Sequence, residues 1–186
     1  MERIYDTARE LTRAMDEIVW AVNPKFDSLD SLANYLGKFA NDYLRAVGIR
    51  CRLNIPVQLP SWPLTSEVRH NLFLAFKETL HNIVKHAAAS EVKVTLDLDS
   101  VGFVLTVEDN GRGFDPDKLA QEAPTQLDRI EHGLGLSNIE RRLAEIGGAC
   151  RIQSSPGNGT RVKLQVRLKH PPRVSGLVTA ASSSEN

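Results

Sequence analysis

The chain has 186 residues, of which 41% are hydrophobic and 25% charged, and its 23 Lys and Arg balance its 23 Asp and Glu. This length allows one globular domain, and the balanced charge gives no support for binding to nucleic acid or direct contact with a membrane surface. No apolar run approaches the length that spans a bilayer. The two cysteines have no metal-type spacing, so we expect reduced thiols in a cytoplasmic domain.

Residues 1–23 are the first predicted element, a helix with a coiled-coil seam. Pro24 cannot continue a helix and therefore ends it. Such a seam usually pairs with another helix, and the alternative is that the helix folds back on its own domain. The seam consists of apolar residues at spacings of four and three: Ile4, Ala8, Leu11, Met15, Ile18 and Val22.

A second helix and a strand follow. The helix is predicted to begin with Asp27 or Ser28 as N-cap and to stop at Gly48. Residues 49–55 alternate with a period of two, which indicates a strand. The helix presents one apolar face, formed by Leu29, Leu32, Leu36, Phe39, Tyr43 and Leu44.

A long third helix is predicted from Thr65 or Ser66, either of which is a suitable N-cap, to about Ala88. After it, residues 92–98 and 103–109 read as two strands around a turn. The helix has an apolar stripe that should meet the sheet, formed by Leu72, Phe73, Phe76, Leu80, Ile83, Val84 and Ala87.

The last third of the chain contains a glycine-rich region, a helix and a hairpin. Ser137 and Glu140 are spaced as a capping box that would open the helix. Residues 149–154 and 160–168 flank the turn signal "SPGNG" and predict a β-hairpin. Residues 170–186 are predicted to be a disordered tail. The expected fold class is therefore α/β, a two-layer sandwich of a mixed sheet of about five strands with three helices.

The third helix carries unusual polar groups in the stretch "ETLHNIVKHA". Glu78 and Asn82 are four residues apart, and Lys85 and His86 follow within one more turn, so all four were expected on one side. An amide oxygen suits Mg²⁺, which takes its other ligands from water and phosphates, and a lysine suits phosphate. A solvated polar helix face is the ordinary explanation for such residues.

Two glycine-rich stretches, "VEDNGRGFD" and "EHGLGLSNIERR", follow later in the chain. In the first, Asp109 ends a strand, and Gly111 and Gly113 would let a ligand approach the backbone closely. In the second, Gly133 and Gly135 lead into a helix N-terminus, which favours anions. About twenty polar residues between the two stretches are long enough for a mobile lid.

The order and spacing of these three stretches resemble the N, G1 and G2 boxes of the ATP-binding domain of sensor histidine kinases, within the GHKL ATPase superfamily. The resemblance covers Thr65 to Leu168 and is greatest to the subclass of nitrate and membrane-fluidity sensor kinases. It implies the two-layer GHKL (Bergerat) fold, with ATP between the helices and under a lid. The segment "AMDEIVWAVNP" also resembles the second helix of that subclass's dimerisation and phosphoacceptor hairpin.

The resemblance implies roles for individual residues. Asn82 matches the Mg²⁺ ligand, Glu78 the acid that assists phosphotransfer, and Asp109 the residue that binds the adenine amino group. Thr160 would help to hold adenine through water. The remaining implied ATP-binding positions are Lys85, His86, Gly111, Gly113, Gly133, Leu134, Gly135 and Leu136.

Two departures from the family pattern are visible. His81 stands where many relatives have a second Asn, and we expect it to point away from the metal. None of the five histidines is followed by an acid or lies in the N-terminal helix, as a phosphoacceptor would. We therefore expect residues 1–23 to be the second helix of a truncated hairpin and residues 24–169 to be the ATP-binding domain.

The sequence thus predicts a catalytic domain that binds ATP and Mg²⁺ and delivers the γ-phosphate to a His on a helix absent from this chain. The expected partners are a response regulator receiver domain and, through the N-terminal helix, a second copy of the full-length protein. The parent protein could be membrane-anchored, with this domain in the cytoplasm. Two alternatives are a serine kinase of the anti-sigma-factor type and a non-catalytic, ATP-responsive dimerisation module.

Overall fold

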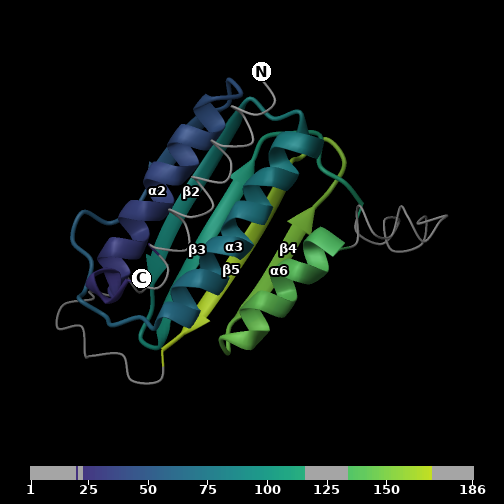
Figure 1. Cartoon of the computed structure of the whole chain (residues 1–186). Helices are drawn as coiled ribbons and strands as arrows, with labels where there is room; N and C mark the ends of the chain where they lie inside the picture. The colour runs from purple at the N-terminus through teal and green to yellow at the C-terminus, as the bar shows by residue number, and fades with distance from the viewer. Residues whose placement is uncertain (1–19, 21–22, 116–133, 169–186) are drawn as a thin grey trace, which may run out of the picture.

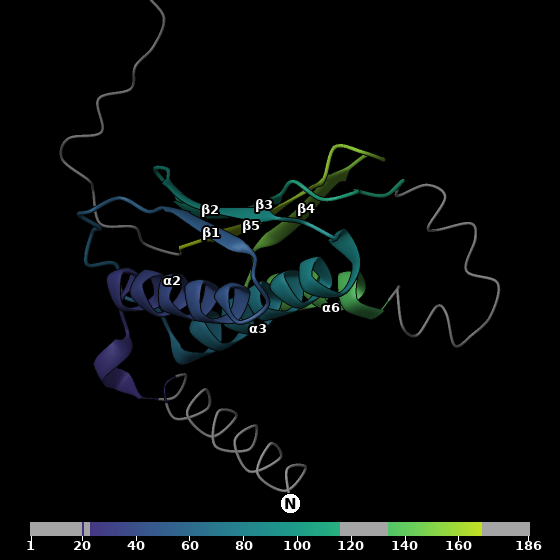
Figure 2. The ribbon, with the colours of Figure 1, turned by 90° about the horizontal axis from the view of Figure 1, so that it is seen from above.

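The computed structural model describes residues 20, 23–115 and 134–168, and its elements form two layers. In the described part of the chain, three α-helices cover one face of a five-stranded sheet (Figures 1 and 2). The elements, in chain order, are η1 Pro24–Phe26, α2 Leu29–Arg45, β1 Arg50–Asn54, α3 Ser66–Asn82, η2 Ile83–Ala87, β2 Glu91–Leu98, β3 Gly102–Asp109, α6 Leu134–Glu145, β4 Ala149–Ser154 and β5 Thr160–Arg167.

The sheet is mixed, as predicted. Its strand order is β1-β2-β3-β5-β4, with β1 parallel to β2 and every other pair antiparallel. β4 and β5 form the predicted hairpin. The predicted α/β sandwich of five strands and three helices is therefore confirmed.

The alternation of apolar and polar residues along the strands explains which face the helices cover. Lys93, Arg161 and Lys163 point to the other, solvated face, where Arg161 Nε donates to Glu108 Oε1 at 2.7 Å. Because side chains alternate across a strand, one set of residues must face the helices. That set is buried and consists of Val92, Val94, Leu96, Phe103, Leu105, Val107, Val162, Leu164 and Val166.

Helix α2 begins and packs as its sequence predicts. Ser28 is the N-cap, and its side chain accepts a hydrogen bond from the amide of Ser31. Leu29, Leu36 and Leu44 are at most 2% exposed, so each is transferred almost completely out of water. Burial of one such side chain contributes about 2 kcal/mol to the free energy of unfolding.

Helix α3 is the central helix of its layer and lies between α2 and α6 (Figure 2). Thr65 caps it, as predicted, by accepting from the amide of Val68. Beyond Asn82 the chain winds as the π-helix η2, where the prediction had a continuous α-helix to about Ala88. Wider turns of this kind often occur at functional sites.

Helix α6 begins at Leu134, so the predicted capping box is wrong and Ser137 lies inside the helix. The reason is visible in the apolar residues that pack against the core. Leu136 is partly buried there, three residues before the fully buried Ile139, which is followed at four by Leu143. This helical spacing starts before Ser137, so the helix has to include it.

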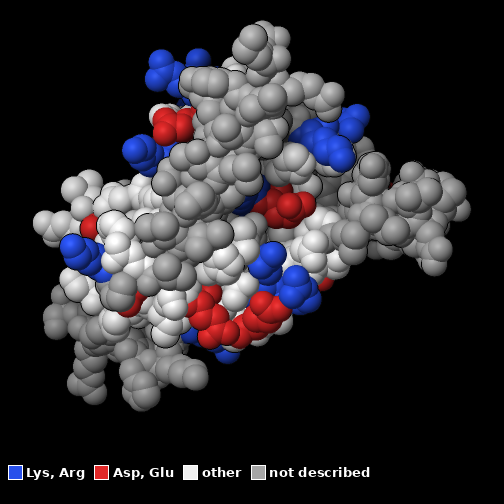
Figure 3. All heavy atoms as spheres, in the orientation of Figure 1, with Lys and Arg blue, Asp and Glu red and all other residues white. Residues whose placement is uncertain are grey.

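The surface charges and the two cysteines are distributed as the balanced composition and the cysteine spacing predict. Acidic and basic side chains are interspersed on the helix-covered face (Figure 3). Cys51 and Cys150 are free and half-buried, on the two edge strands β1 and β4. Burial, together with the nearby Glu140 carboxylate, raises the pKa of Cys150 to about 12, which makes its thiol unreactive at neutral pH.

Some predictions lie outside the described residues. They are the helix at residues 1–23, apart from Trp20 and Asn23, the lid at residues 116–133, and the tail at residues 170–186. Among the helices that the structure describes, none has the length and apolar character needed to cross a bilayer.

Candidate functional site

A cavity of about 180 Å³ lies between α3 and η2 on one side and α6 and the ends of β3 and β5 on the other. It brings together six of the predicted site residues, which come from four separate segments of the chain. These six are Asn82, His86, Asp109, Gly113, Leu136 and Thr160.

Asp109, the last residue of β3, provides a buried carboxylate at this cavity. The residue is 8% exposed, and its Oδ1 accepts a hydrogen bond from the amide of Gly111 at 2.8 Å. Burial raises the pKa of Asp109, and hydrogen bonds from Gly111 and Thr160 partly offset this rise. Its Oδ2 is buried and has no hydrogen-bond partner among the described residues. An unsatisfied buried acceptor is costly, so this atom is suited to a ligand that donates an N–H.

The loop after β3 fits closely between η2 and the β4–β5 hairpin. The amide of Arg112 donates to Ala87 O at 2.8 Å, and the carbonyl of Arg112 accepts from the amide of Gly157 at 2.7 Å. Gly113 has a φ of +61°, and a Cβ there would be 2.1 Å from Ser155 O. A Cβ on Gly111 would be 2.3 Å from Ala87 O. Both glycines are therefore required by the packing of the cavity wall.

Ser154 joins the loop after β3 to the start of β5 on the far wall of the cavity. Its Oγ accepts from the amide of Phe114 at 2.9 Å, donates to Gly159 O at 2.9 Å and lies 3.0 Å from Thr160 Oγ1. Phe114 and Thr160 both line the cavity, so one hydroxyl positions an aromatic ring and a polar group there.

The first turn of α6 lies directly against the polar face of α3. A Cβ on Gly135 would be 2.7 Å from Glu78 Oε1 and 3.3 Å from Asn82 Nδ2. The first amides of a helix have no partners within it, and the helix dipole places partial positive charge there. A carboxylate, an amide and a helix N-terminus therefore lie together beside the cavity.

The structure does not bring all the predicted residues to the cavity. Glu78 and Lys85 are absent from its lining, and Lys85 is exposed on η2. Gly133 lies outside the described residues, as does the side chain of Leu134. Gly111 and Gly135 support the wall and the neighbouring polar groups.

His81 lies on the α2 side of α3. Its Nδ1 is 3.4 Å from the Tyr43 hydroxyl, within hydrogen-bond distance. Burial and the Glu78 carboxylate raise the pKa of Tyr43. His81 thus points toward α2, whereas Asn82 and Glu78 meet Gly135 of α6, which agrees with the expectation that His81 faces away from a metal at Asn82.

Sequence reasoning missed several residues of the cavity wall. Ile83 and Ala87 belong to the buried core, as the predicted apolar stripe requires, and they also line the cavity, which was not predicted. Phe114 lies within the quoted stretch "VEDNGRGFD", directly after Gly113, which is the signal that could have found it. The other residues missed are Thr79, Arg112, Ile139 and Val162.

The donor groups near the cavity determine how a metal could be held. Within the described ranges, no group of three His, Cys, Asp or Glu side chains could hold a metal ion by itself. Asn82 offers a single neutral amide oxygen. This set fits Mg²⁺, which commonly binds through one or two protein ligands and the phosphates of a nucleotide.

Curated relatives of this chain are sensor kinases. It is 31% identical over 137 residues to the sensor histidine kinase ComP of Bacillus subtilis, a match that covers 74% of this chain and 16% of the relative. It is 25% identical over 141 residues to the sensor protein VraS of Staphylococcus epidermidis, covering 76% of this chain and 38% of the relative. The chain therefore spans well under half the length of these relatives.

Solved structures show the same fold. The ATP binding domain of PrrB from Mycobacterium tuberculosis matches with a TM-score of 0.55 at 24% identity, over 73% of this chain and 92% of that one. The histidine kinase domain of the blue-light activated kinase EL346 from Erythrobacter litoralis matches with a TM-score of 0.57 at 22% identity, over 74% of this chain and 61% of that one.

The family model that matches is described as "Histidine kinase-, DNA gyrase B-, and HSP90-like ATPase" and covers residues 67–170. This range includes α3, η2 and every strand except β1, and hence every described wall of the cavity. The chain therefore belongs to the family of histidine kinase-, DNA gyrase B- and HSP90-like ATPases.

Proposed function

We propose that this chain is the ATP-binding catalytic domain of a two-component sensor histidine kinase, in the subclass of the nitrate and membrane-fluidity sensors. The observation that carries the proposal is the buried Oδ2 of Asp109, which has no hydrogen-bond partner in the part of the chain that the structure describes and lies beside a cavity walled mainly by apolar side chains. An adenine ring would fill the apolar space, and its amino group would donate to Asp109. Thr160, adjacent to Asp109 in the sheet, would hold the ring through water.

The phosphates would lie toward the first turn of α6. Gly133, Leu134, Gly135 and Leu136 are at or next to that turn, where backbone amides favour anions. Asn82 would provide the protein ligand to Mg²⁺, and Lys85 and His86 on η2 would add charge and hydrogen bonds. The bound metal would neutralise charge on the phosphates.

Glu78 is the candidate catalytic residue. Its carboxylate lies next to Gly135, close to the expected phosphates and outside the base pocket. There it would orient or deprotonate an incoming imidazole. Catalysis would otherwise depend on positioning and charge neutralisation, as is general for phosphoryl transfer.

The phosphoacceptor would be a histidine on a dimerisation helix, and the phosphate would pass on to a response regulator receiver domain. The N-terminal helix would pair within a homodimer of the full-length protein. The domain would act in the cytoplasm, which holds ATP, whether or not the parent is anchored in a membrane.

Calorimetric titration with ATP, with and without Mg²⁺, tests the proposal. We expect binding in the chain as it stands and a loss of affinity of roughly a hundredfold in Asp109→Asn, because the amide presents a donor where an acceptor is required. Asp97→Asn, which changes an exposed carboxylate of β2, is the matched control and should bind normally. Absence of binding, or equal binding by both variants, would contradict the proposed nucleotide site.

The titration also distinguishes the proposed function from the non-catalytic alternative. A non-catalytic module that has lost nucleotide binding would give no heat with ATP. A serine kinase would bind ATP in the same way, so incubation with radiolabelled ATP and a phosphoacceptor hairpin is needed to distinguish it. Acid-labile phosphate on the hairpin supports the histidine kinase, and acid-stable phosphate supports the serine kinase.

A further inference from the structure

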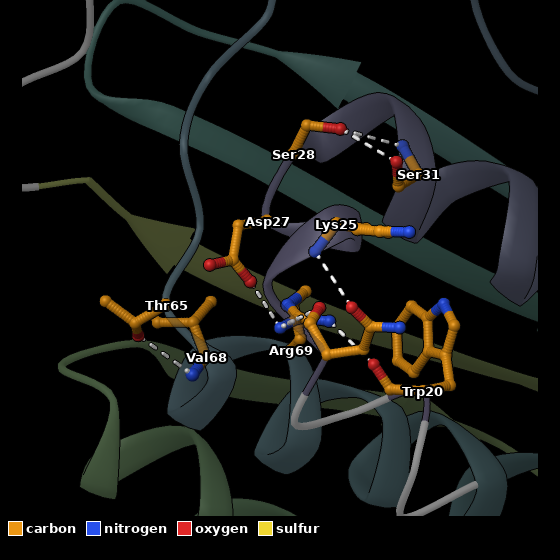
Figure 4. A network of polar contacts seen from close by, with 9 residues as sticks. Trp20, Lys25, Asp27, Ser28, Ser31, Thr65, Val68 and Arg69 are labelled. Atoms are coloured by element: carbon orange, nitrogen blue, oxygen red, sulfur yellow. Dashed lines mark hydrogen bonds and ion pairs between the residues drawn. The ribbon is translucent and has the colours of Figure 1, made fainter. Parts of the chain in front are cut away.

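Arg69 of α3 is a fully buried arginine that the proposed chemistry does not use. It is 0% exposed, which is rare for arginine unless its charge is paired. Its Nη1 donates to Trp20 O at 2.8 Å and its Nη2 to Asn23 O at 3.3 Å. Nη2 also forms an ion pair with Asp27 Oδ1 (Figure 4). One guanidinium therefore binds three oxygens of the segment that precedes α2.

The sequence explains why the carbonyl of Trp20 needs a donor. In an α-helix the carbonyl of Trp20 would accept from the amide four residues later, but that residue is Pro24, which has no N–H. Asn23 O accepts from the amide of Phe26 at 3.1 Å within the short turn η1. Arg69 supplies to Trp20 O the donor that Pro24 cannot supply.

Trp20 fixes the same segment through its ring. The residue is 7% exposed, and its ring stacks on Tyr35 of α2 at 3.8 Å with an interplanar angle of 7°. The ring also meets Phe73 of α3 edge-on at 6.2 Å, and Arg69 Cζ lies 5.4 Å from its centroid. Stacking and cation–π contacts of this kind contribute to stability in addition to the burial of apolar area. Trp20 is thereby bound to both α2 and α3.

The helix that holds this segment is the one that carries the candidate catalytic groups. Glu78 lies nine residues beyond Arg69 on α3, roughly 13 Å along the axis, and Asn82 lies one turn further. A guanidinium with three partners and an aromatic stack allow little rotation between the segment and α3. The positions of Trp20, Asn23 and Asp27 are thus defined relative to Glu78.

We propose that Arg69 is a positioning residue, which clamps Trp20, Asn23 and Asp27 to α3 and so fixes their position relative to Glu78 and Asn82. The effect on phosphate transfer rests on the proposed function, because the phosphoacceptor helix would be attached through this segment. The clamp itself does not depend on ATP.

Fluorescence of Trp20 measures the clamp. Trp20 and Trp62 are the two tryptophans of the chain, so Trp62→Phe leaves Trp20 as the sole reporter. In this background Arg69→Lys keeps the charge but replaces the planar fork by one nitrogen that cannot bind all three oxygens. We expect quenching of Trp20 by acrylamide to increase about threefold. Arg141→Lys, which changes an exposed ion pair with Glu145 on α6, is the matched control and should leave the quenching unchanged.

Unchanged quenching in a folded Arg69→Lys protein would overturn the clamp. If that variant does not fold, Asp27→Asn replaces it, because the Asp27 side chain is 42% exposed and loses only the ion pair. Quenching should then increase by about half, since one of three polar contacts is lost, and an unchanged value would again overturn the proposal. ATP should not change the quenching of Trp20 when Arg69 is intact. An increase on addition of ATP would show that the contact between Arg69 and Trp20 can be released, and would overturn the fixed clamp.

Transfer measurements separate positioning from a purely structural role. In a longer form of the protein that contains a phosphoacceptor histidine, Arg69→Lys should lower the rate of phosphorylation roughly tenfold with an unchanged KM for ATP. An unchanged rate would overturn the positioning role. If no form of the protein binds ATP, the proposed function fails, while the quenching result still decides whether the clamp exists.

Discussion

Gly135 of α6 lies so close to Glu78 of α3 that a Cβ on the glycine would be 2.7 Å from the carboxylate oxygen Oε1. The atom it would meet is the end of a flexible side chain, so the carboxylate can move while both helices stay in place. This contact brings the stretch "EHGLGLSNIERR" to the helix that carries "ETLHNIVKHA", although more than fifty residues separate Gly135 from Glu78. It also allows chemistry to be tested separately from stability.

Gly135→Ala should preserve the fold and impair the site. Alanine favours a helix by about 1 kcal/mol over glycine, which offsets the cost of moving Glu78. We expect a thermal midpoint within a few degrees of the parent chain and an affinity for Mg·ATP that is lower by about tenfold. Thermal denaturation and calorimetry check the two parts. Unchanged affinity would show that Glu78 and Asn82 have no part in binding the phosphates.

Gly113→Ala should instead destabilise the whole domain. The added Cβ would meet the backbone oxygen of Ser155 at 2.1 Å, and the φ of +61° is unfavourable for alanine. We expect a loss of at least about 3 kcal/mol in the free energy of unfolding measured with urea. Gly157→Ala is the control, since that glycine has a φ of +80° and nothing within 4 Å, and it should lose only about 1 kcal/mol. Equal losses would contradict a packing role for Gly113.

Asp109→Asn should stabilise the chain at neutral pH. Because the folded pKa of Asp109 is raised above its ordinary value of 3.8, the native state binds more protons than the unfolded state between the two values. The carboxylate therefore contributes less stability as the pH rises through the folded pKa, and its replacement should raise the free energy of unfolding at pH 7.

This gain should shrink as the pH falls through the folded pKa of Asp109, because the carboxyl group is then neutral in the parent chain too. Urea denaturation of both proteins at a series of pH values measures the difference. A gain that does not change with pH would show that ionisation of Asp109 is not its cause.

Ser154→Ala should weaken both the fold and the binding of the base. The hydroxyl that contacts Phe114, Gly159 and Thr160 would be lost, at a cost of about 1–2 kcal/mol in stability. Binding of adenosine should weaken by about threefold, because Thr160 and Phe114 would be less well positioned. Ser155→Ala, at an exposed position in the same turn, should change neither quantity measurably. Similar effects of both substitutions would contradict the connecting role of Ser154.

Local patterns predicted most of the fold. The period-two strands, the caps Ser28 and Thr65 and the hairpin turn depend on neighbouring residues, which the sequence displays directly. The start of α6 was wrong because the apolar spacing of Leu136, Ile139 and Leu143, which begins before Ser137, decides the helix start over the capping-box pair.

The site was predicted to the extent that its motifs contain their own chemistry. Asp109, Asn82 and Gly113, which line the cavity, could be singled out because a carboxylate, an amide and a glycine are informative in those contexts. Ile83 and Ala87 were not, because an apolar residue looks the same whether it faces the sheet or a cavity. The buried role of Arg69 could not be predicted, since it depends on a carbonyl left without a donor 49 residues earlier.

Because η2 is a π-helix, the number of residues in Ile83–Ala87 matters for the shape of the cavity wall. Its hydrogen bonds run from i to i+5, so its turn holds more residues than an α-helical turn, and Asn82, Ile83, His86 and Ala87 all line the cavity. Deletion of any one residue from Ile83–Ala87 would let the helix close as an ordinary α-turn, which would rotate His86 away and shift the entry into β2. Evolution could therefore exchange side chains in this segment but could not easily change its residue count. The same constraint applies to anyone who redesigns this domain by transferring α3 from a relative.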